Sequence, residues 1–443
     1  MIKYFDANNL YGYALSQSLP YGDFKWVDPA TWKDFYDNGF WSALPFSRVF
    51  NHINMCPTNY FLEVDAVFPD SIHEKMRDLP MLLEQIIPPG SDSKVPKLIN
   101  HVGPRSRYVL SYEMYQLAKR QGVEFPVIHR ILSYSQRKWL KPYIEFNSNE
   151  RVKAKDSFSK DYFKLLNNSL YGKMCEDVMK YVNYEIYTSW KIESYQSLHL
   201  SKPFLIKNET VYQRCNEHEM DNEAEVCTEF SSCVVGVERR KFRVKLNKPI
   251  YVGAKVLEIS KLLMYDIWYN SIVPQFGDRA KLLATDTDSF VIQFRTPNLI
   301  ADLIPIRNRF DFFNYPQSHP LFSTCNERVP GFMKDEYPNS VIREWVGLRP
   351  KCYAFKCDDL SVVKRAKGVK KDVVKRQVHF DDYLQVWREE GAVLYRTQRM
   401  IRSTNQTLYT VEQTKKALSA NDDKRFICDD NVNTLPWFHK DIK

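Results

Sequence analysis

The chain has 443 residues, of which 44% are hydrophobic and 14% aromatic. This length exceeds the usual size of one domain and the apolar content excludes a disordered chain, so we expect two or three packed subdomains. Lys and Arg number 63 against 54 Asp and Glu, and the net charge of +9 is compatible with a polyanionic partner without requiring one.

Several classes of protein are excluded because their signals are missing. The opening residues MIKYFDANNLYG contain no basic segment followed by an apolar one, so they do not form a secretory signal. No run approaches ~18 apolar residues, and we expect no membrane contact. The nine cysteines include no CxxC pair, which favours reduced thiols in an intracellular protein. Because the phosphate-binding loops GxxxxGK[ST] and GxGxxG are absent, side-chain cations and a metal ion would have to hold any nucleotide.

The predicted elements change in kind along the chain. Residues 1–6 form a short strand that ends at an acid, and residues 20–105, broken by Pro, Gly and Asp, predict a loop-rich insertion with short helices. Residues 176–230 are strand-like, and the residues after about 363 predict charged helical segments with little apolar bulk. Helical periodicity covers residues 111–122, about 153–173 and 254–271.

Residues 281–294 predict a hairpin, because two apolar runs flank a tight acidic turn. Asp286 and Asp288 would lie at its buried tip, where clustered carboxylates are costly unless cations neutralise them. Hard oxygen ligands at such a turn suit Mg²⁺. The alternative is an Asp-rich turn whose side chains cap their own backbone, and the tetrapeptide alone favours that alternative.

Asp6 ends the predicted strand IKYFD. An acid in this place could join the hairpin acids and complete a metal site. The alternative is an acid that caps the start of a helix, and for a single Asp that is the simpler interpretation.

A polar stripe is predicted on the helix over residues 153–173. Lys160, Lys164, Asn168 and Tyr171 follow one another at steps of four, four and three, which places them on one helical face. Two ammonium groups one turn apart repel each other, and a triphosphate is an anion that would hold them together. The alternative is a solvated basic stripe, but a separate apolar face is offered by Leu165, Leu166 and Leu170.

Taken in order, these segments resemble motifs A, B and C of family B DNA polymerases. The family patterns are D-x-x-[S/N]-L-Y, K-x-x-x-N-S-x-Y-G and D-T-D-S, followed downstream by K-x-Y, and they match residues 6–11, 164–172, 286–289 and 351–353. The long gaps between motifs resemble those of the protein-primed branch, known from viruses, linear plasmids and Maverick/Polinton transposons. Asn9 and Gly12 depart from the commonest pattern without removing a metal ligand.

The resemblance implies an α+β right hand with an antiparallel palm sheet. The implied parts are palm 1–20, an insertion of the terminal-protein-contact type 21–139, fingers 140–174, a second insertion with a return to the palm 175–250, palm 251–369 and thumb 370–443.

The resemblance also implies roles for single residues. The catalytic acids would be Asp6, Asp286 and Asp288, and two Mg²⁺ ions, with Mn²⁺ as a substitute, would be held by Asp6, Asp288 and the carbonyl of Ala7. The nucleotide would contact Tyr11, which blocks a ribose 2′-hydroxyl, and Lys160, Lys164, Asn168 and Tyr171. The DNA would contact Ser169, Gly172, Lys351 and Tyr353.

Seven basic residues and one acid lie in the segment 364–376. A solvated surface and a nucleic-acid contact both explain such a run on composition alone. From the resemblance we expect a thumb that grips the duplex backbone through Lys367, Lys370 and Lys371.

The expected activity is template-directed DNA synthesis on a primer-template with dNTPs, and a terminal protein is a candidate primer. The expected setting is replication of a viral or transposon-like DNA in the nucleus or at a viral replication site. Family members carry an exonuclease domain before motif A, whereas motif A here begins at residue 6, so we expect a fragment or a remnant without proofreading. Two rivals stay open, a catalytically inactive DNA-binding remnant and a metal-dependent nuclease or nucleotidyltransferase of another fold.

Overall fold

The computed structural model describes residues 1–32, 44–91, 94–180, 244–389, 391–404 and 407–442, and the backbone alone of 182–188, 212–214, 225–231 and 234–240. The chain divides into two compact units. The first comprises Met1–Gly172, Tyr251–Arg396 and Lys415–Lys443, and the second comprises Lys173–Ile250 and Thr397–Thr414.

The first unit is built on a mainly antiparallel sheet. Six of its strands follow the order β12 (Ala280–Thr285), β13 (Ser289–Phe294), β1 (Ile2–Ala7), β16 (Ile342–Arg349), β17 (Cys352–Cys357) and β18 (Val362–Ala366). Beside β1 lies β15 (Met333–Asp335), which pairs in parallel with β14 (Phe310–Asp311). Along β1, Lys3, Phe5 and Ala7 are buried, while Tyr4 and Asp6 alternate with them on the more open face. The predicted hairpin over 281–294 is confirmed as β12 and β13.

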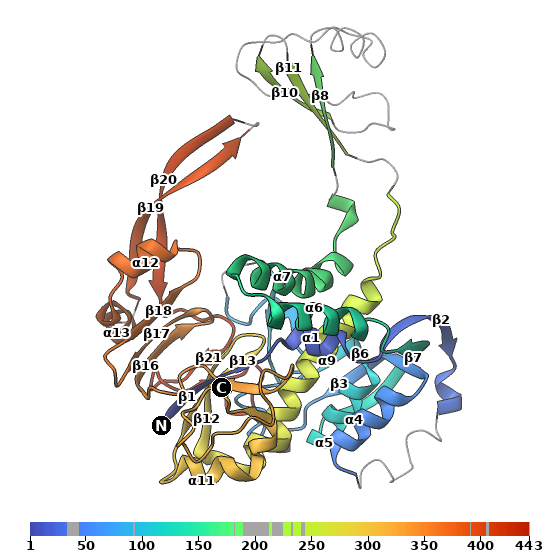
Figure 1. Cartoon of the computed structure of the whole chain (residues 1–443), viewed down its shortest axis with the longest axis vertical. Helices are drawn as coiled ribbons and strands as arrows, with labels where there is room; N and C mark the ends of the chain where they lie inside the picture. The colour runs from blue at the N-terminus through green and yellow to red at the C-terminus, as the bar shows by residue number, and fades with distance from the viewer. Residues whose placement is uncertain are drawn as a thin grey trace. The chain divides into compact units, whose positions relative to one another are not determined.

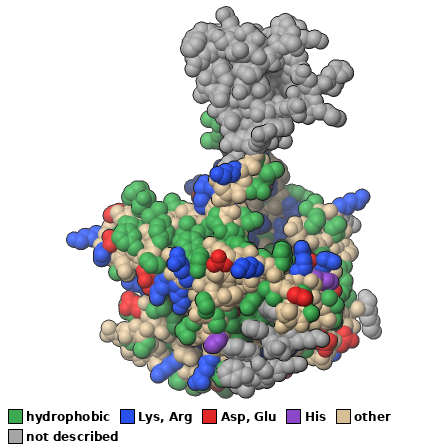
Figure 2. Space-filling view, turned by 90° about the vertical axis from the view of Figure 1, so that its right-hand side faces the viewer, with side chains coloured by type: hydrophobic (Ala, Val, Ile, Leu, Met, Phe, Trp, Pro, Cys, Tyr) green, Lys and Arg blue, Asp and Glu red, His purple; other side chains and the backbone are tan. Residues whose placement is uncertain are grey.

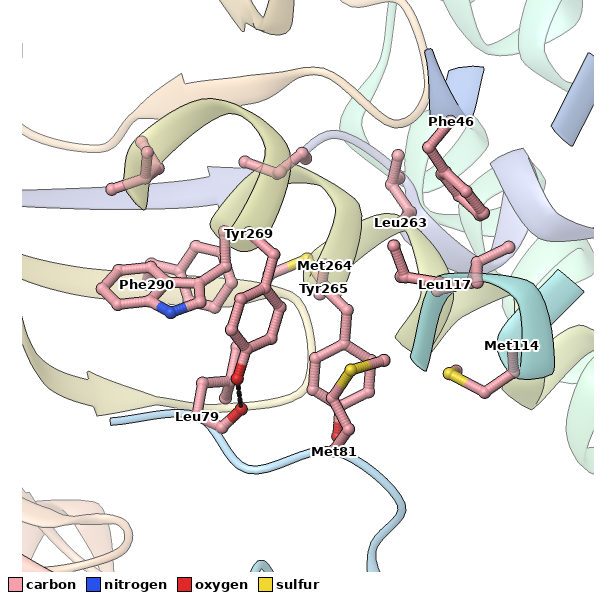
Figure 3. Close-up of a cluster of buried hydrophobic side chains, with 14 of the residues drawn as sticks. Phe46, Leu79, Met81, Met114, Leu117, Leu263, Met264, Tyr265, Tyr269 and Phe290 are labelled. Carbon is pink, nitrogen blue, oxygen red and sulfur yellow. Dashed lines mark hydrogen bonds between the residues drawn. The ribbon is translucent and has the colours of Figure 1, made fainter. Parts of the chain in front are cut away.

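One face of this sheet packs on helix α9 (Ile250–Ile267), which continues as a π-helical turn (Trp268–Ile272) and then as α10 (Val273–Phe276). The side chains of Tyr265 and Tyr269 extend from it toward the buried segment 79–81, and the Tyr269 hydroxyl donates to the Leu79 carbonyl (Figure 3). Phe290 of β13 belongs to the same cluster. The predicted helix over 254–271 is therefore confirmed, and it anchors the strand that begins at the acidic turn.

A second antiparallel sheet lies within residues 19–137. Its order is β2 (Leu19–Val27), β7 (Glu124–Arg137), β3 (Thr58–Val67) and β6 (Arg105–Ser111). The prediction of a loop-rich insertion over 20–105 was therefore wrong, because it missed the strands β2 and β3 of this sheet. The pairing of β3 with β7 is irregular, with register shifts at Glu63/Val64 and Asp65/Val67.

The same part of the chain contains the helices α4 (Phe46–Met55) and α5 (Tyr112–Gln121). It also contains a separate two-stranded sheet of β4 (Glu84–Ile86) and β5 (Lys97–Ile99). The helix predicted over 111–122 is confirmed as α5. The Ser111 hydroxyl accepts the N–H of Met114 at its start, and Gly122 ends it with φ of 101°, a conformation that favours glycine. A buried ion pair between Lys255 and Glu113 joins α9 to α5.

Helices α6 (Lys141–Lys153) and α7 (Ser157–Met174) lie side by side (Figure 1). The buried Asn147 amide donates to Asn167 Oδ1 at 2.9 Å and fixes their contact. The helix predicted over about 153–173 is confirmed as α7. The short helix α1 (Leu10–Leu15) follows β1 and is capped by Asn9, so Asp6 is not the helix cap considered from the sequence.

The later part of the chain carries α12 (Lys371–Gln377) and α13 (Phe380–Arg388), and then a long hairpin of β19 (Val393–Thr404) and β20 (Thr407–Ser419). The prediction of helical segments was thus correct for the two helices and wrong for the hairpin. Tyr395, Ile401 and Leu408 are exposed while Gln398 is buried, so hydrophobic residues do not mark the less exposed side of this hairpin.

The remaining elements are short. They are α11 (Leu299–Leu303), β21 (Phe426–Ile427), β22 (Thr434–Leu435), and 3₁₀ turns at Pro29–Trp32, Asp70–Ile72, Val178–Lys180, Gly277–Arg279 and Ile304–Arg309. In the second unit, β8 (Val182–Thr188), β11 (Val234–Arg240), β10 (Glu225–Ser231) and β9 (Tyr212–Arg214) form an antiparallel sheet in that order. This confirms the strand-like character predicted for 176–230 where the backbone is described.

Two properties of the whole chain bear on its partners. Among the described residues no helix is both long and apolar enough to cross a membrane. On the face shown in Figure 2, Lys and Arg side chains lie spread among hydrophobic and polar ones. The positive net charge alone therefore does not locate a binding surface on that face.

Candidate active site

The acidic turn between β12 and β13 is closed by main-chain hydrogen bonds. Thr287 has φ of 61°, the left-handed region, and the Asp288 N–H donates to the Asp286 carbonyl at 2.6 Å. This tight turn lets the two strands stay paired up to Thr285 and Phe290. The Asp288 carboxyl is thereby fixed directly before the strand that pairs with β1.

The register of β1 and β13 brings Asp6 beside the acidic turn. Asp6 faces Ser289 across the two strands, and the Ala7 N–H donates to the Asp288 carbonyl at 2.7 Å. Two acids far apart in sequence therefore lie on neighbouring chain segments at one edge of the sheet.

The charges at this edge are unfavourable without a cation. Burial, and next the carboxylate of Asp288, raise the pKa of Asp6 to about 7, while Lys334 and Lys164 act in the opposite direction. Burial also raises the pKa of Asp288, and Asp286 adds to that rise. Half-buried carboxylates that repel each other gain most from a divalent cation, and their oxygens are the ligands that Mg²⁺ prefers. The residues present thus fit a magnesium site.

A third acid, Glu336, acts on both carboxylates. It was not predicted as a site residue from the sequence. Its charge contributes to the raised pKa of Asp6 and of Asp288. It directly follows β15, its N–H donates to the Tyr4 carbonyl at 2.9 Å, and its carboxylate pairs with Lys334 at 2.6 Å. In sequence the run Lys-Asp-Glu resembles a charged surface, and only the pairing of β15 with β1 shows that it lies at the site.

The polar stripe of α7 reaches the same region. Lys164 lies near enough to Asp6 to lower its pKa, and the Tyr171 ring stacks on Tyr11 with 4.6 Å between centroids and 12° between planes. Lys160 and Asn168 are exposed on the helix. The structure therefore brings residues of motif B onto residues of motif A.

The rest of α7 corrects one detail of the prediction. Leu165, expected on an apolar face, is 62% exposed, whereas Asn167 is buried against α6. The helix is held by an amide contact in addition to its leucines, because α6 offers it a polar partner. Ser169 bonds its hydroxyl to the Leu166 carbonyl, and Gly172 lies where a Cβ would meet nothing.

The K-x-Y element joins the acidic turn from the other side. Lys351 lies in the turn between β16 and β17 with φ of 61°, and its Nζ is 2.9 Å from Asp286 Oδ1. The Tyr353 ring stacks on Trp345 at 4.8 Å. Burial, and then a hydrogen bond with Tyr4, raise the pKa of Tyr353. Both residues therefore lie on the face of the sheet that carries Asp6.

The basic run over 364–376 is divided between β18, a turn and α12. Lys367, Lys370 and Lys371 are exposed, and the Lys367 N–H donates to the Lys351 carbonyl at 3.2 Å. Lys364, in contrast, donates its ammonium to the carbonyls of Lys375 and Val378 and so supports the end of α12. One of the seven cations thus has a structural task that composition did not reveal.

With this geometry described, comparison with known proteins identifies the class. Residues 1–274 match the family described as DNA polymerase type B, organellar and viral, and the chain belongs to that family. The resemblance read from the motifs is thereby confirmed at the level of the family. No curated protein matches the chain.

Solved structures show the same fold. Phi29 DNA polymerase in an orthorhombic crystal form is 13% identical with a TM-score of 0.54, and Phi29 DNA polymerase complexed with primer-template DNA and incoming nucleotides is 15% identical with the same TM-score. Each comparison covers 94% of this chain and 58% of the other. The chain therefore spans less than two thirds of the length of these polymerases. At such identities the likeness establishes the mixed α+β fold with antiparallel sheets.

Proposed function

We propose that this chain is a DNA-directed DNA polymerase that adds deoxynucleotides to a primer 3′-hydroxyl. The observation that carries the proposal is the meeting of Asp6, Asp288 and Lys164 at one sheet edge in a chain of this family. The sheet around β1 would be the palm, α6 and α7 the fingers, and the region from 370 on the thumb. The residues 21–139 and 175–250 would be insertions of the protein-primed type.

The acids are suited to hold two divalent metal ions. Asp6 and Asp288, with the carbonyl of Ala7, would be the ligands of Mg²⁺, or of Mn²⁺ in its place. When bound, the metals lower the pKa of the primer hydroxyl and neutralise the charge of the phosphoryl group and leaving pyrophosphate. Asp286 would act beside them, held in place by Lys351.

The incoming nucleotide would lie between α7 and α1. Lys164, with Lys160 one turn earlier, supplies positive charge for the triphosphate, which develops negative charge in the transition state. The stacked rings of Tyr11 and Tyr171 would line the sugar and base, with Asn168 beside them. Tyr11 would exclude a ribose 2′-hydroxyl by its bulk.

The primer-template would cross the face of the sheet that carries Asp6. Lys351 and Tyr353 would steady the primer end, Ser169 and Gly172 would face the template, and Lys367, Lys370 and Lys371 would contact the duplex backbone. The Phi29 polymerase bound to primer-template DNA and nucleotides has this fold, which supports these partners. We extend the proposal to the replication of a viral or transposon-like DNA in the nucleus or at a viral replication site, with a terminal protein as a candidate primer.

Primer extension tests the proposal. The chain is incubated with a 5′-labelled primer-template, Mg²⁺ and either all four dNTPs or a single dNTP. We expect template-directed lengthening that is lost in a chelator and that follows the template base when that base is changed. An inactive remnant would bind the DNA and leave the primer unchanged. A nuclease would shorten the primer whether or not dNTPs were present, and either result would overturn the proposal.

A further inference from the structure

A buried histidine lies far from the polymerase acids in sequence, in the segment that follows β22. The His439 side chain is 0% exposed, and its Nε2 has no hydrogen-bond partner among the described residues. A buried polar atom without a partner costs about 1–3 kcal/mol, so such atoms usually face a water or an ion. The other ring nitrogen accepts the N–H of Asp441 at 3.3 Å.

Two carboxylates lie beside this imidazole, one near each ring nitrogen. Glu74 Oε1 lies 3.6 Å from His439 Nε2, and Asp441 Oδ2 lies 3.6 Å from Nδ1. One ligand atom from each of the three residues lies within 4.8 Å of the other two. Both acidic side chains are 56% exposed, which leaves them free to move by the short distance that coordination requires.

The neighbouring His73 is not available as a fourth ligand. Its Nε2 bonds to the Phe68 carbonyl at 3.0 Å, and its Nδ1 accepts the N–H of Lys440 at 3.0 Å. By accepting the N–H of Lys440, His73 instead fixes the main chain between His439 and Asp441. Three protein ligands with the remaining position open to water is a common arrangement for zinc.

We propose that Glu74, His439 and Asp441 form a binding site for one divalent transition-metal ion, best suited to Zn²⁺ and separate from the polymerase acids. Nitrogen from one imidazole and oxygen from two carboxylates suit zinc better than magnesium, which prefers oxygen alone. The bound ion would cross-link the segment 436–442 to the turn after residues 70–72. The same two regions are already joined through Lys440 and His73, and Trp437 accepts the N–H of Val102 nearby.

Thermal unfolding with and without Zn²⁺ tests this site. Excess Mg²⁺ is kept in every sample so that the polymerase acids do not supply the zinc response. Since a ligand that binds only the folded state stabilises it, saturating Zn²⁺ should raise the Tm of the wild-type chain by about 2 °C or more. Glu74→Gln and Asp441→Asn change exposed side chains and should fold normally, with wild-type Tm in a chelator, but should lose the zinc response.

Calorimetric titration with Zn²⁺ under the same conditions should show one site fewer in each variant than in the wild type. His129→Gln is the matched control, because His129 pairs with Asp65 at 2.8 Å elsewhere in the same unit, and this variant should respond to zinc like the wild type. The proposal would be overturned if Zn²⁺ left the Tm of the wild-type chain unchanged. It would also be overturned if the Glu74→Gln and Asp441→Asn chains bound as many Zn²⁺ ions as the wild type and showed the same rise in Tm.

Discussion

Three acidic residues meet where neighbouring strands end, and the order of the strands explains why. Asp288 precedes β13, Asp6 lies near the end of β1, and Glu336 follows β15, and these strands run antiparallel to β1 on both sides. The first two acids could be predicted because their motifs are local in sequence. Glu336 could not, because its place depends on the pairing of β15 with β1.

Replacing Glu336 by Gln should raise the Mg²⁺ concentration needed for half-maximal primer extension by about fivefold or more. The reason is that removing one negative charge weakens the attraction for divalent cations by roughly 1 kcal/mol or more in a partly buried site. A magnesium titration of the extension rate measures this shift. Glu344→Gln is the control, since Glu344 is an exposed acid on β16 paired with Lys356, and it should leave the titration unchanged. An unshifted titration for Glu336→Gln would remove this acid from the site.

Tyr11→Val should increase incorporation of ribonucleotides relative to deoxynucleotides. In the proposed site the ring of Tyr11, which stacks on Tyr171, would fill the space that a 2′-hydroxyl needs, and truncation would open that space. Single-nucleotide incorporation with matched dNTP and rNTP measures the ratio. Tyr11→Phe keeps the ring and should keep the discrimination. If Tyr11→Val discriminates as well as the wild type, Tyr11 only packs against its neighbours.

Among the elements, helices were predicted better than strands. The helices α5 and α9 bury recurring apolar positions, and α5 also carries a Ser cap and a Gly end that are local in sequence. The strands β3 and β7 pair with register shifts, and the hairpin of β19 and β20 exposes apolar side chains, so in neither place do hydrophobic residues simply mark a buried face. Sequence periodicity reports burial, and it fails where burial is irregular.

The adjacent residues Asn167 and Asn168 on α7 should separate stability from activity. Asn167→Ala leaves the buried Asn147 amide without its acceptor and should cost about 1–3 kcal/mol. Asn168 is exposed, so Asn168→Ala should leave stability nearly unchanged while it lowers nucleotide incorporation. Urea unfolding followed beside primer extension measures both effects. Equal stability of the two variants would contradict the assigned roles.

At the scale of the whole molecule, the order of the motifs predicted the family. The fold of most of the chain between the motifs was not predicted. Motif residues lie at strand ends, tight turns and one helix face, and such positions tolerate little variation in spacing. The path between them is set by pairings such as β1 with β13, which join residues from both ends of the chain. No local pattern can reveal these pairings, so the second sheet had to be found in the structure.

The exposed cations of the segment 364–376 should contribute to DNA binding through phosphates. Replacing Lys367, Lys370 and Lys371 together by Gln should weaken primer-template binding and flatten the slope of log K against log salt by up to ~3 units, at ~0.9 per lost contact. Fluorescence anisotropy over a range of salt measures the slope. Lys94→Gln, an exposed change within residues 19–137, should leave it unaltered. Unchanged affinity and slope in the triple variant would identify a solvated surface.

The most direct test of the central claim is single-nucleotide incorporation by Asp288→Asn on a saturating primer-template. If Asp288 holds the catalytic metals, the rate should fall by about 1000-fold or more, because the charge of the transition state loses its neutralisation. DNA affinity should stay near that of the wild type, since it depends on phosphate contacts. Asp429→Asn, at an exposed acid, should keep the wild-type rate. An Asp288→Asn chain that extends primers at nearly the wild-type rate would contradict the account.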